Sequence, residues 1–243
     1  MKKSIIFLSL LLAFFSCSEH KVSDIDRQNL NGELRSMLII SYQAEEKFNE
    51  IYKGKKEWED SNDGDTYILF DKNGNIKEST VFNQDRSIKS KFIARYNKKG
   101  NLIEKNIYNT DASLKNKTVH KYNKNNQLIE STEYNSSGKL KAKWNFNFDS
   151  KGNEIEKIAF NSQGNAVSRS SARYDNSGQI IERIDYDSSG NILLKRVFEY
   201  DTKGNEIELI EFGTDGKIDY KTSAKYDNLG NVINLTVDSL LLF

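Results

Sequence analysis

The sequence predicts an all-β fold, an antiparallel β-meander or ribbon of seven 26-residue repeats with two strands each. An aromatic residue recurs every 26 residues without insertion or deletion, at Phe70, Tyr96, Tyr122, Phe148, Tyr174, Tyr200 and Tyr226. Asp or Asn follows each of these aromatics, and glycine stands four residues after six of the seven. The exception is Asn126, the residue type that best tolerates glycine's left-handed conformation.

Each repeat is expected to contain a main turn after this aromatic and a second turn 12 residues later. In an aromatic-Asp-x-x-Gly segment, the Asp side chain caps a tight turn and glycine supplies the left-handed residue that starts the return strand. The second turn has its own aromatic and, in four copies, its own glycine: Gly138, Gly164, Gly190 and Gly216. Arg86 and Ala112 occupy this glycine position in the first two copies, whose second turns are therefore expected to be degenerate versions of the turn motif.

Opposite charges recur at fixed phase along the repeats. Glu stands eight residues after the main aromatic, and a basic residue stands 21 after it, as in Glu130 and Lys143. If a four-residue loop pairs Tyr134 with Lys139, Glu130 lies directly opposite Lys143, and such cross-strand pairs contribute roughly 0.2–1 kcal/mol each. Paired carboxylates also serve as catalytic acids and bases, but six identical copies favour a structural ladder.

The apolar content is too low for a thick core. Hydrophobic residues make up 37% of the chain, against roughly 45–50% in ordinary globular domains. A thin sheet that is exposed to solvent over much of its surface fits this composition. Neighbouring apolar residues such as Leu102 and Ile103 break strict alternation, so the sequence leaves open whether the sheet is flat or coiled. The 36 basic and 35 acidic residues nearly cancel, which gives no indication of a nucleic-acid partner.

The chain divides into four segments: a signal peptide at 1–16, a polar tether at 17–31, a non-repeating N-terminal cap at 32–65 and the β-repeat domain at 66–243. Within the cap, Glu33 to Tyr42 resembles a strand, and 43–53 suits either a short helix or another strand. Terminal units of repeat proteins are usually atypical because they cover an open end of the stack.

The N-terminus predicts export and membrane anchoring. Two lysines precede the apolar run from Ile5 to Phe15, which is too short for a spanning helix. Ser16 and Cys17 follow, an order similar to substrates of bacterial signal peptidase II. Cys17, the single cysteine, is therefore the expected lipidation site, and the lipid would be the membrane contact. The alternative is a stray thiol in a cleaved leader.

The recurring Tyr-Asp-x-x-Gly units, such as Tyr174 to Gly178 and Tyr200 to Gly204, resemble the YD repeats of RHS-type proteins. That resemblance covers Phe70 to about Val237 and implies a long β-meander, sometimes coiled. The chain is also similar to repeat-bearing lipoproteins common in Bacteroidetes, which implies a cell-envelope location, an outer-membrane lipoprotein facing either the periplasm or the cell surface.

Few residues outside the repeat pattern suggest a site. Asp71 to Asn75 superficially resembles a calcium loop, although a side-chain-capped turn explains it equally. The two histidines, His20 and His120, give no metal pattern, so no metal, cofactor or catalytic residue is expected. Trp144 stands where other repeats have Phe, Thr, Ser or Arg. It is the candidate ligand-binding residue, by stacking on a ligand such as a sugar, or it fills a local packing gap.

Three function classes follow. A non-catalytic binding module for a glycan or a protein comes first, since repeat sheets offer long surfaces. A structural cell-envelope scaffold and a toxin-immunity protein are the alternatives. An enzyme is disfavoured because no non-repeated cluster of acid, base and nucleophile is visible.

Overall fold

The computed structural model describes residues 23–28, 30, 33–40, 42–47, 50–56 and 65–239. The predicted signal peptide, His20 and Cys17 lie outside these residues. Fifteen strands form one antiparallel sheet in the order β1-β4-β5 through to β17, so every strand after β4 pairs with its neighbours in sequence. This confirms the predicted β-meander.

The strands of the repeats alternate between shorter and longer arms on either side of the two turns. In chain order they are β4 (Thr66–Phe70), β5 (Ile76–Phe82), β6 (Ile88–Tyr96), β7 (Leu102–Tyr108), β8 (Leu114–Tyr122), β9 (Leu128–Asn135), β10 (Leu140–Phe148), β11 (Glu154–Phe160), β12 (Ala166–Tyr174), β13 (Ile180–Tyr186), β14 (Ile192–Tyr200), β15 (Glu206–Phe212), β16 (Ile218–Tyr226) and β17 (Val232–Ser239). Almost every strand pair in the repeats carries one register shift beside its turn. The strands therefore meet through bulged hairpins, which increase local twist.

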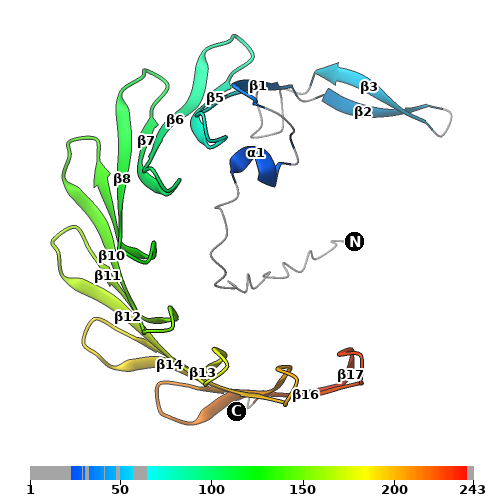
Figure 1. Ribbon diagram of the computed structural model, residues 1–243, viewed down its shortest axis with the longest axis vertical. Helices are drawn as coiled ribbons and strands as arrows, with labels where there is room; N and C mark the ends of the chain where they lie inside the picture. Colours follow the sequence, from blue (N-terminus) through cyan, green and yellow to red (C-terminus); the bar gives the residue numbers. More distant parts are fainter. Residues whose placement is uncertain are drawn as a thin grey trace.

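The sheet is a single layer that runs as an open arc (Figure 1). It is therefore curved rather than flat, a point that the sequence left open. Among the described residues, the buried hydrophobic side chains are Ile25, Ile68, Phe70 and Ala94. Three of these form one small cluster at the N-terminal end of the sheet. The thin, wetted sheet expected from composition is thus present, and its strands are stabilised by their neighbours rather than by a central core.

Two elements cover the N-terminal end of the sheet. Strand β1 (Ser36–Ile39) pairs with β4, as expected of a cap. Helix α1 (Asp24–Arg27) lies inside the arc, with a capping box between Ser23 and Asp26. Its Ile25 is buried against Ile68 and Phe70. The segment expected to be a polar tether therefore includes a docked helix, held by the buried Ile25 side chain and by hydrogen bonds to the first main turn.

The region 43–53, for which helix and strand were both open, forms a separate two-stranded sheet. Strand β2 (Tyr42–Lys47) pairs with β3 (Glu50–Lys56) as a hairpin. It projects beyond the end of the arc (Figure 1).

The second turns of the first two repeats are not degenerate. Arg86 and Ala112 adopt positive φ values of 65° and 64°, close to the 76° of Gly138 at the same position. Both retain the turn hydrogen bond, from Arg86 N to Asn83 O and from Ala112 N to Asn109 O. The paired strands on either side hold the turn in the left-handed conformation even where the side chain disfavours it.

The charge ladder is present in all six copies, but its predicted register is wrong. Lysine or arginine contacts glutamate at 2.6–3.4 Å in the pairs Lys91–Glu78, Lys117–Glu104, Lys143–Glu130, Arg169–Glu156, Lys195–Glu182 and Lys221–Glu208. However, Glu130 lies opposite Asn145, and Lys143 opposite Thr132. The hairpin pairs Tyr134 with Leu140 and adds a bulge before Ala142, so the two charges meet on a diagonal.

These glutamates have a second set of partners that was not predicted from the sequence. The residue immediately before the main aromatic lies directly opposite the ladder glutamate, as Lys121 does for Glu130. Its ammonium nitrogen is 2.7 Å from the carboxylate. Arg95 and Arg173 make the same contact with Glu104 and Glu182 at 3.6 and 3.4 Å. The available signal was a basic residue directly before four of the seven main aromatics: Arg95, Lys121, Arg173 and Lys225.

Ala112→Gly should stabilise the protein by about 1 kcal/mol. The left-handed conformation costs a non-glycine residue roughly 1–2 kcal/mol, and glycine's greater freedom in the unfolded chain returns part of that gain. The matched control is Gly138→Ala, where the added methyl group meets open space, so that only backbone strain is measured. Urea unfolding midpoints of both variants test this. Destabilisation by Ala112→Gly would contradict the assigned turn.

Charge reversal tests the ladder at Glu156 and Arg169, whose Oε1 and Nε atoms lie 2.6 Å apart. Glu156→Lys alone should cost of order 0.5–1 kcal/mol at low salt, and Arg169→Glu added to it should restore most of this. Hydrogen bonding to Arg169 lowers the pKa of Glu156. The coupling is therefore present above the carboxyl group's ordinary pKa and is lost as the pH falls through its folded value. Additive single-variant effects at neutral pH and low salt would exclude the pair.

Candidate ligand-binding site

The main turns are built alike in all seven repeats. In the first, Asp71 Oδ1 accepts hydrogen bonds from the backbone N–H of Asn73 at 2.8 Å and of Asn75 at 3.0 Å, and Gly74 has a φ of 77°. In the other six main turns, the side-chain Oδ1 of the Asp or Asn likewise accepts from the backbone N–H two residues further along the chain. These acceptors are Asn97, Asn123, Asp149, Asp175, Asp201 and Asp227. The predicted side-chain-capped turn is confirmed, and the oxygen suggested as a calcium ligand is occupied by backbone amides.

Tyrosine hydroxyl groups connect five of the main turns to the turn before them. The hydroxyl group donates to the first carbonyl after the preceding main turn at 2.8–2.9 Å in five copies: Tyr96 to Ile76, Tyr122 to Leu102, Tyr174 to Glu154, Tyr200 to Ile180 and Tyr226 to Glu206. Burial is the largest cause that raises the pKa of Tyr96 and of Tyr200 to about 12. Phe148 lacks the hydroxyl group needed for this bond.

Successive main turns also contact each other directly, and each such contact is called a junction below. In three junctions a lysine donates to a carbonyl of the next turn: Lys99 to Lys124 O at 3.5 Å, Lys151 to Asn176 O at 3.1 Å and Lys203 to Asn228 O at 3.3 Å. In two others a glutamine donates to the next glycine: Gln127 to Gly152 O at 3.2 Å and Gln179 to Gly204 O at 2.9 Å. We call these Lys junctions and Gln junctions.

Helix α1 takes the place of a preceding turn at the first repeat. Ile25 N donates to Gly74 O at 3.1 Å, the same carbonyl that glutamine bonds at the Gln junctions. Asp24 Oδ2 accepts from Ile76 N at 2.7 Å. The helix therefore caps the main-turn edge of the stack, while β1 caps the sheet.

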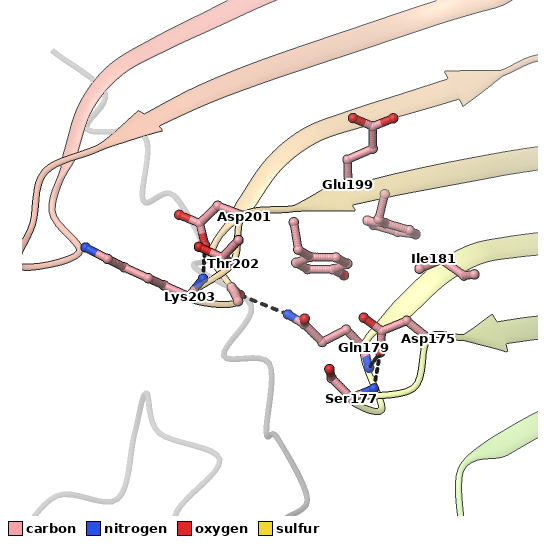
Figure 2. A pocket seen from close by; sticks show the side chains of 11 residues that line it. Asp175, Ser177, Gln179, Ile181, Glu199, Asp201, Thr202 and Lys203 are labelled. Carbon is pink, nitrogen blue, oxygen red and sulfur yellow. Dashed lines mark hydrogen bonds between the residues drawn. The ribbon is translucent and has the colours of Figure 1, made fainter.

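A hollow of about 690 Å³ lies at the Gln junction between the fifth and sixth main turns (Figure 2). Its volume is within the roughly 300–1,000 Å³ of small-molecule sites. Ser177 and Gln179 line it from one turn, Thr202 lines it from the next, and Phe198 and Tyr200 line it from β14. Phe198 and Tyr200 are two residues apart on one strand, so their rings project from the same face.

The charged groups around this hollow are largely occupied. Asp175 Oδ1 accepts from Ser177 N and Gln179 N at 2.8 and 2.9 Å. Asp201 carries the matching bonds in its own turn, and hydrogen bonding to Asn205 is the largest cause lowering its pKa. Lys203 extends away from Gln179, and Glu199 points away from both Ser177 and Gln179 (Figure 2). What remains is a mostly neutral polar lining beside two aromatic rings.

Trp144, the candidate from the sequence, is half-buried on β10 and lies opposite Ser131 on one side and Ala159 on the other. Neither neighbour is bulky, and the role of Trp144 in stacking on a ligand stays a prediction. Trp144 and Phe146 are two residues apart, so Trp144 shares the face of the Gln junction at Gln127. His120 also lies opposite Ser131, and burial lowers its pKa.

The described residues contain no group of three or more His, Cys, Asp or Glu side chains placed to hold a metal ion. Among the same residues, no helix has the length and apolar character to cross a membrane. The junction hollow was not predicted from the sequence, although Gln127 and Gln179, which replace asparagine in the repeat pattern, were its signal.

Comparison with known proteins yields limited matches. A family model described as "Uncharacterised protein" matches residues 70–163, and no curated protein matches the chain. Among solved structures, a porin-like protein from Bacteroides uniformis is 10% identical with a TM-score of 0.38, covering 85% of this chain and 87% of its own.

Two toxin structures are also similar. The TcdB2-TccC3-TEV structure is 13% identical with a TM-score of 0.31, and the Photorhabdus luminescens Tc holotoxin pore is 13% identical with a TM-score of 0.28. They cover 76% and 73% of this chain, which spans only 12% and 11% of theirs. At these TM-scores the likeness carries no argument about this chain's function. With the strand topology, what is established is that this is a β-repeat protein.

Tyr200→Phe should lower the free energy of unfolding by about 1 kcal/mol, because it removes the partly buried hydroxyl bond to Ile180 O. The folded pKa of about 12 lies above the ordinary value of 10.0. The unfolded tyrosine therefore loses its proton first, and stability falls as the pH rises from about 10 to 12. That fall should be shallower in Tyr200→Phe than in the natural sequence, as measured by urea unfolding at each pH.

Phe148→Tyr is the reverse substitution and should gain stability by a similar amount, since it can supply the missing bond to Leu128 O. Loss of stability there would show that the bond depends on features of the other five copies.

Proposed function

We propose that this chain is a non-catalytic, envelope-anchored lipoprotein that acts as a binding module for a glycan or a protein. The observation that carries the proposal is the hollow between successive main turns, on an open sheet whose repeats present the same edge again and again. Repeat sheets of this kind use their extended surfaces for binding.

The charged residues support binding rather than catalysis. The ladder glutamates recur in six copies, each paired with a basic residue. Repeated ion pairs of this kind explain the carboxylates as structural groups. His120 recurs in no other repeat, and its buried Nδ1 has no hydrogen-bond partner among the described residues, so nothing orients it as a general base.

The proposed cellular location rests on the sequence. The apolar leader and Ser16-Cys17 support lipidation at Cys17, and the recurring Tyr-Asp-x-x-Gly units support membership among the YD-repeat, RHS-like lipoproteins of the Bacteroidetes kind. In this proposal the lipid holds the protein in the outer membrane, facing the periplasm or the cell surface.

Cys17→Ser should abolish acylation. Metabolic labelling with a palmitate analogue and detergent phase partitioning measure this directly. The natural protein should label and enter the detergent phase, and the variant should do neither. A variant that still labels and partitions with membranes would overturn the lipid anchor at this residue.

The binding role is tested by presenting the purified protein to a glycan array and, separately, by chemical crosslinking on intact cells followed by mass spectrometry. Saturable binding to a glycan or one specific crosslinked partner supports a binding module. If neither is found and deletion weakens the envelope, the protein is a structural scaffold, a role to which the six stiffening ion pairs are also suited.

A further inference from the structure

A second period of 52 residues lies on top of the 26-residue repeat. It involves three positions at each junction. The first and second lie three and five residues after a main aromatic, and the third lies two residues before the following main aromatic. At the Lys junctions these are Lys99, Asn101 and His120; Lys151, Asn153 and Ala172; and Lys203, Asn205 and Ala224. At the Gln junctions they are Asn125, Gln127 and Phe146; and Ser177, Gln179 and Phe198. At these five junctions the three positions change together, whereas the first main turn has Asn73, Asn75 and Ala94 and follows neither type.

The two kinds of junction differ in what they leave open. A lysine that reaches the next turn, as Lys151 reaches Asn176 O, lays its long side chain across the gap between the turns. At a Gln junction the residue in that position is short, and glutamine makes the bond to glycine instead. A phenylalanine then lies where the next Lys junction has alanine. At the Gln179 junction the result is an open hollow with an aromatic wall.

We infer that the two Gln junctions, at Gln127–Gly152 and Gln179–Gly204, are paired subsites for one neutral glycan chain. This rests on the proposed binding function and assigns its ligand class and location. The two junctions have matching geometry, since a Cβ added at either glycine would stand 3.3 Å from the glutamine Nε2. The Gln179 junction holds the hollow of about 690 Å³.

The chemistry of the hollow selects a neutral, hydroxyl-rich ligand. Ser177 Oγ, Gln179 Oε1 and the Thr202 hydroxyl bond to no other described residue, so they can exchange hydrogen bonds with sugar hydroxyls. The rings of Phe198 and Tyr200 offer flat apolar surface for the C–H face of a sugar. An anion would meet Asp175 and Asp201, and the nearby Lys203 is already bonded to Asn228 O. A cation would find Oδ1 of both Asp175 and Asp201 already accepting hydrogen bonds from backbone N–H groups.

The spacing suits a chain rather than a single sugar. Four strands separate the two junctions, which corresponds to ~19 Å along the sheet at ~4.8 Å per strand. Trp144 is on the same face as Phe146, two residues further along β10, and extends the aromatic surface at the first subsite. A ligand that bridges both subsites gains affinity from the second contact.

The inference is tested by converting one type of junction into the other, because both types already occur in this sheet. The triple variant Ser177→Lys, Gln179→Asn and Phe198→Ala converts the second Gln junction to the Lys type. The matched control, Lys99→Ser, Asn101→Gln and His120→Phe, applies the opposite exchange to a Lys junction whose residues do not line the hollow. Affinity electrophoresis of the purified full chain in gels containing dextran, xylan, glucomannan or laminarin gives a dissociation constant for each polysaccharide, and the thermal unfolding midpoint checks folding.

The exchange at Gln179 should weaken binding at least about tenfold, through loss of bivalent contact, while the thermal midpoint stays near that of the natural sequence. The control should bind as well as the natural sequence or more tightly. Glycan binding unaffected by the exchange in a folded variant would overturn this inference and leave the proposed function intact. Retention only by an anionic polysaccharide, heparin, or binding of a protein partner and no glycan, would also overturn it. Absence of any ligand or partner would overturn the proposed function itself.

Discussion

We attribute the curvature of this molecule to the hydrogen bonds between successive main turns. Lysine or glutamine from one turn reaches a backbone carbonyl of the next at one edge of the sheet. At the other edge, glycines of the second turns such as Gly138 and Gly164 have nothing within 4 Å of an added Cβ. When the main-turn edge of a sheet is held closer together than the second-turn edge, the sheet curves toward the main-turn edge. Curvature therefore follows from side chains at two positions of the repeat, and the hollow lies where those side chains leave the gap between turns open.

A single-layer sheet of this kind depends on nearest neighbours, because no second layer buries its faces. Strand pairing, the ladder ion pairs and the tyrosine bonds all join adjacent hairpins, so stability should accumulate repeat by repeat. The ends are then the weak points. At the N-terminal end, β1 covers the sheet and α1 covers the turn edge. At the other end, Ile233, Leu235 and Val237 on β17 are more than half exposed, and no described strand pairs with the outer edge of β17.

The repeat in the sequence predicted the meander, the turns and the charge pairing, because a fixed period makes each copy a check on the others. It failed where the answer depends on geometry between copies. The ladder register was wrong since bulges such as the one before Ala142 leave no mark in the spacing. Arg86 and Ala112 looked incompatible with the turn, yet neighbouring strands impose it. Gln127 and Gln179 were visible as departures from asparagine, but only the structure shows that they bond to the next turn.

Small-angle X-ray scattering tests the origin of the arc most directly. The variant replaces the five junction residues by alanine: Lys99, Gln127, Lys151, Gln179 and Lys203. With those contacts removed, the sheet should relax toward a straight ribbon of about 67 Å, the span of 15 strands at ~4.8 Å spacing. The account predicts a larger radius of gyration for the variant, with far-ultraviolet circular dichroism unchanged. An unchanged radius of gyration in a folded variant would contradict it and assign the curvature to strand twist.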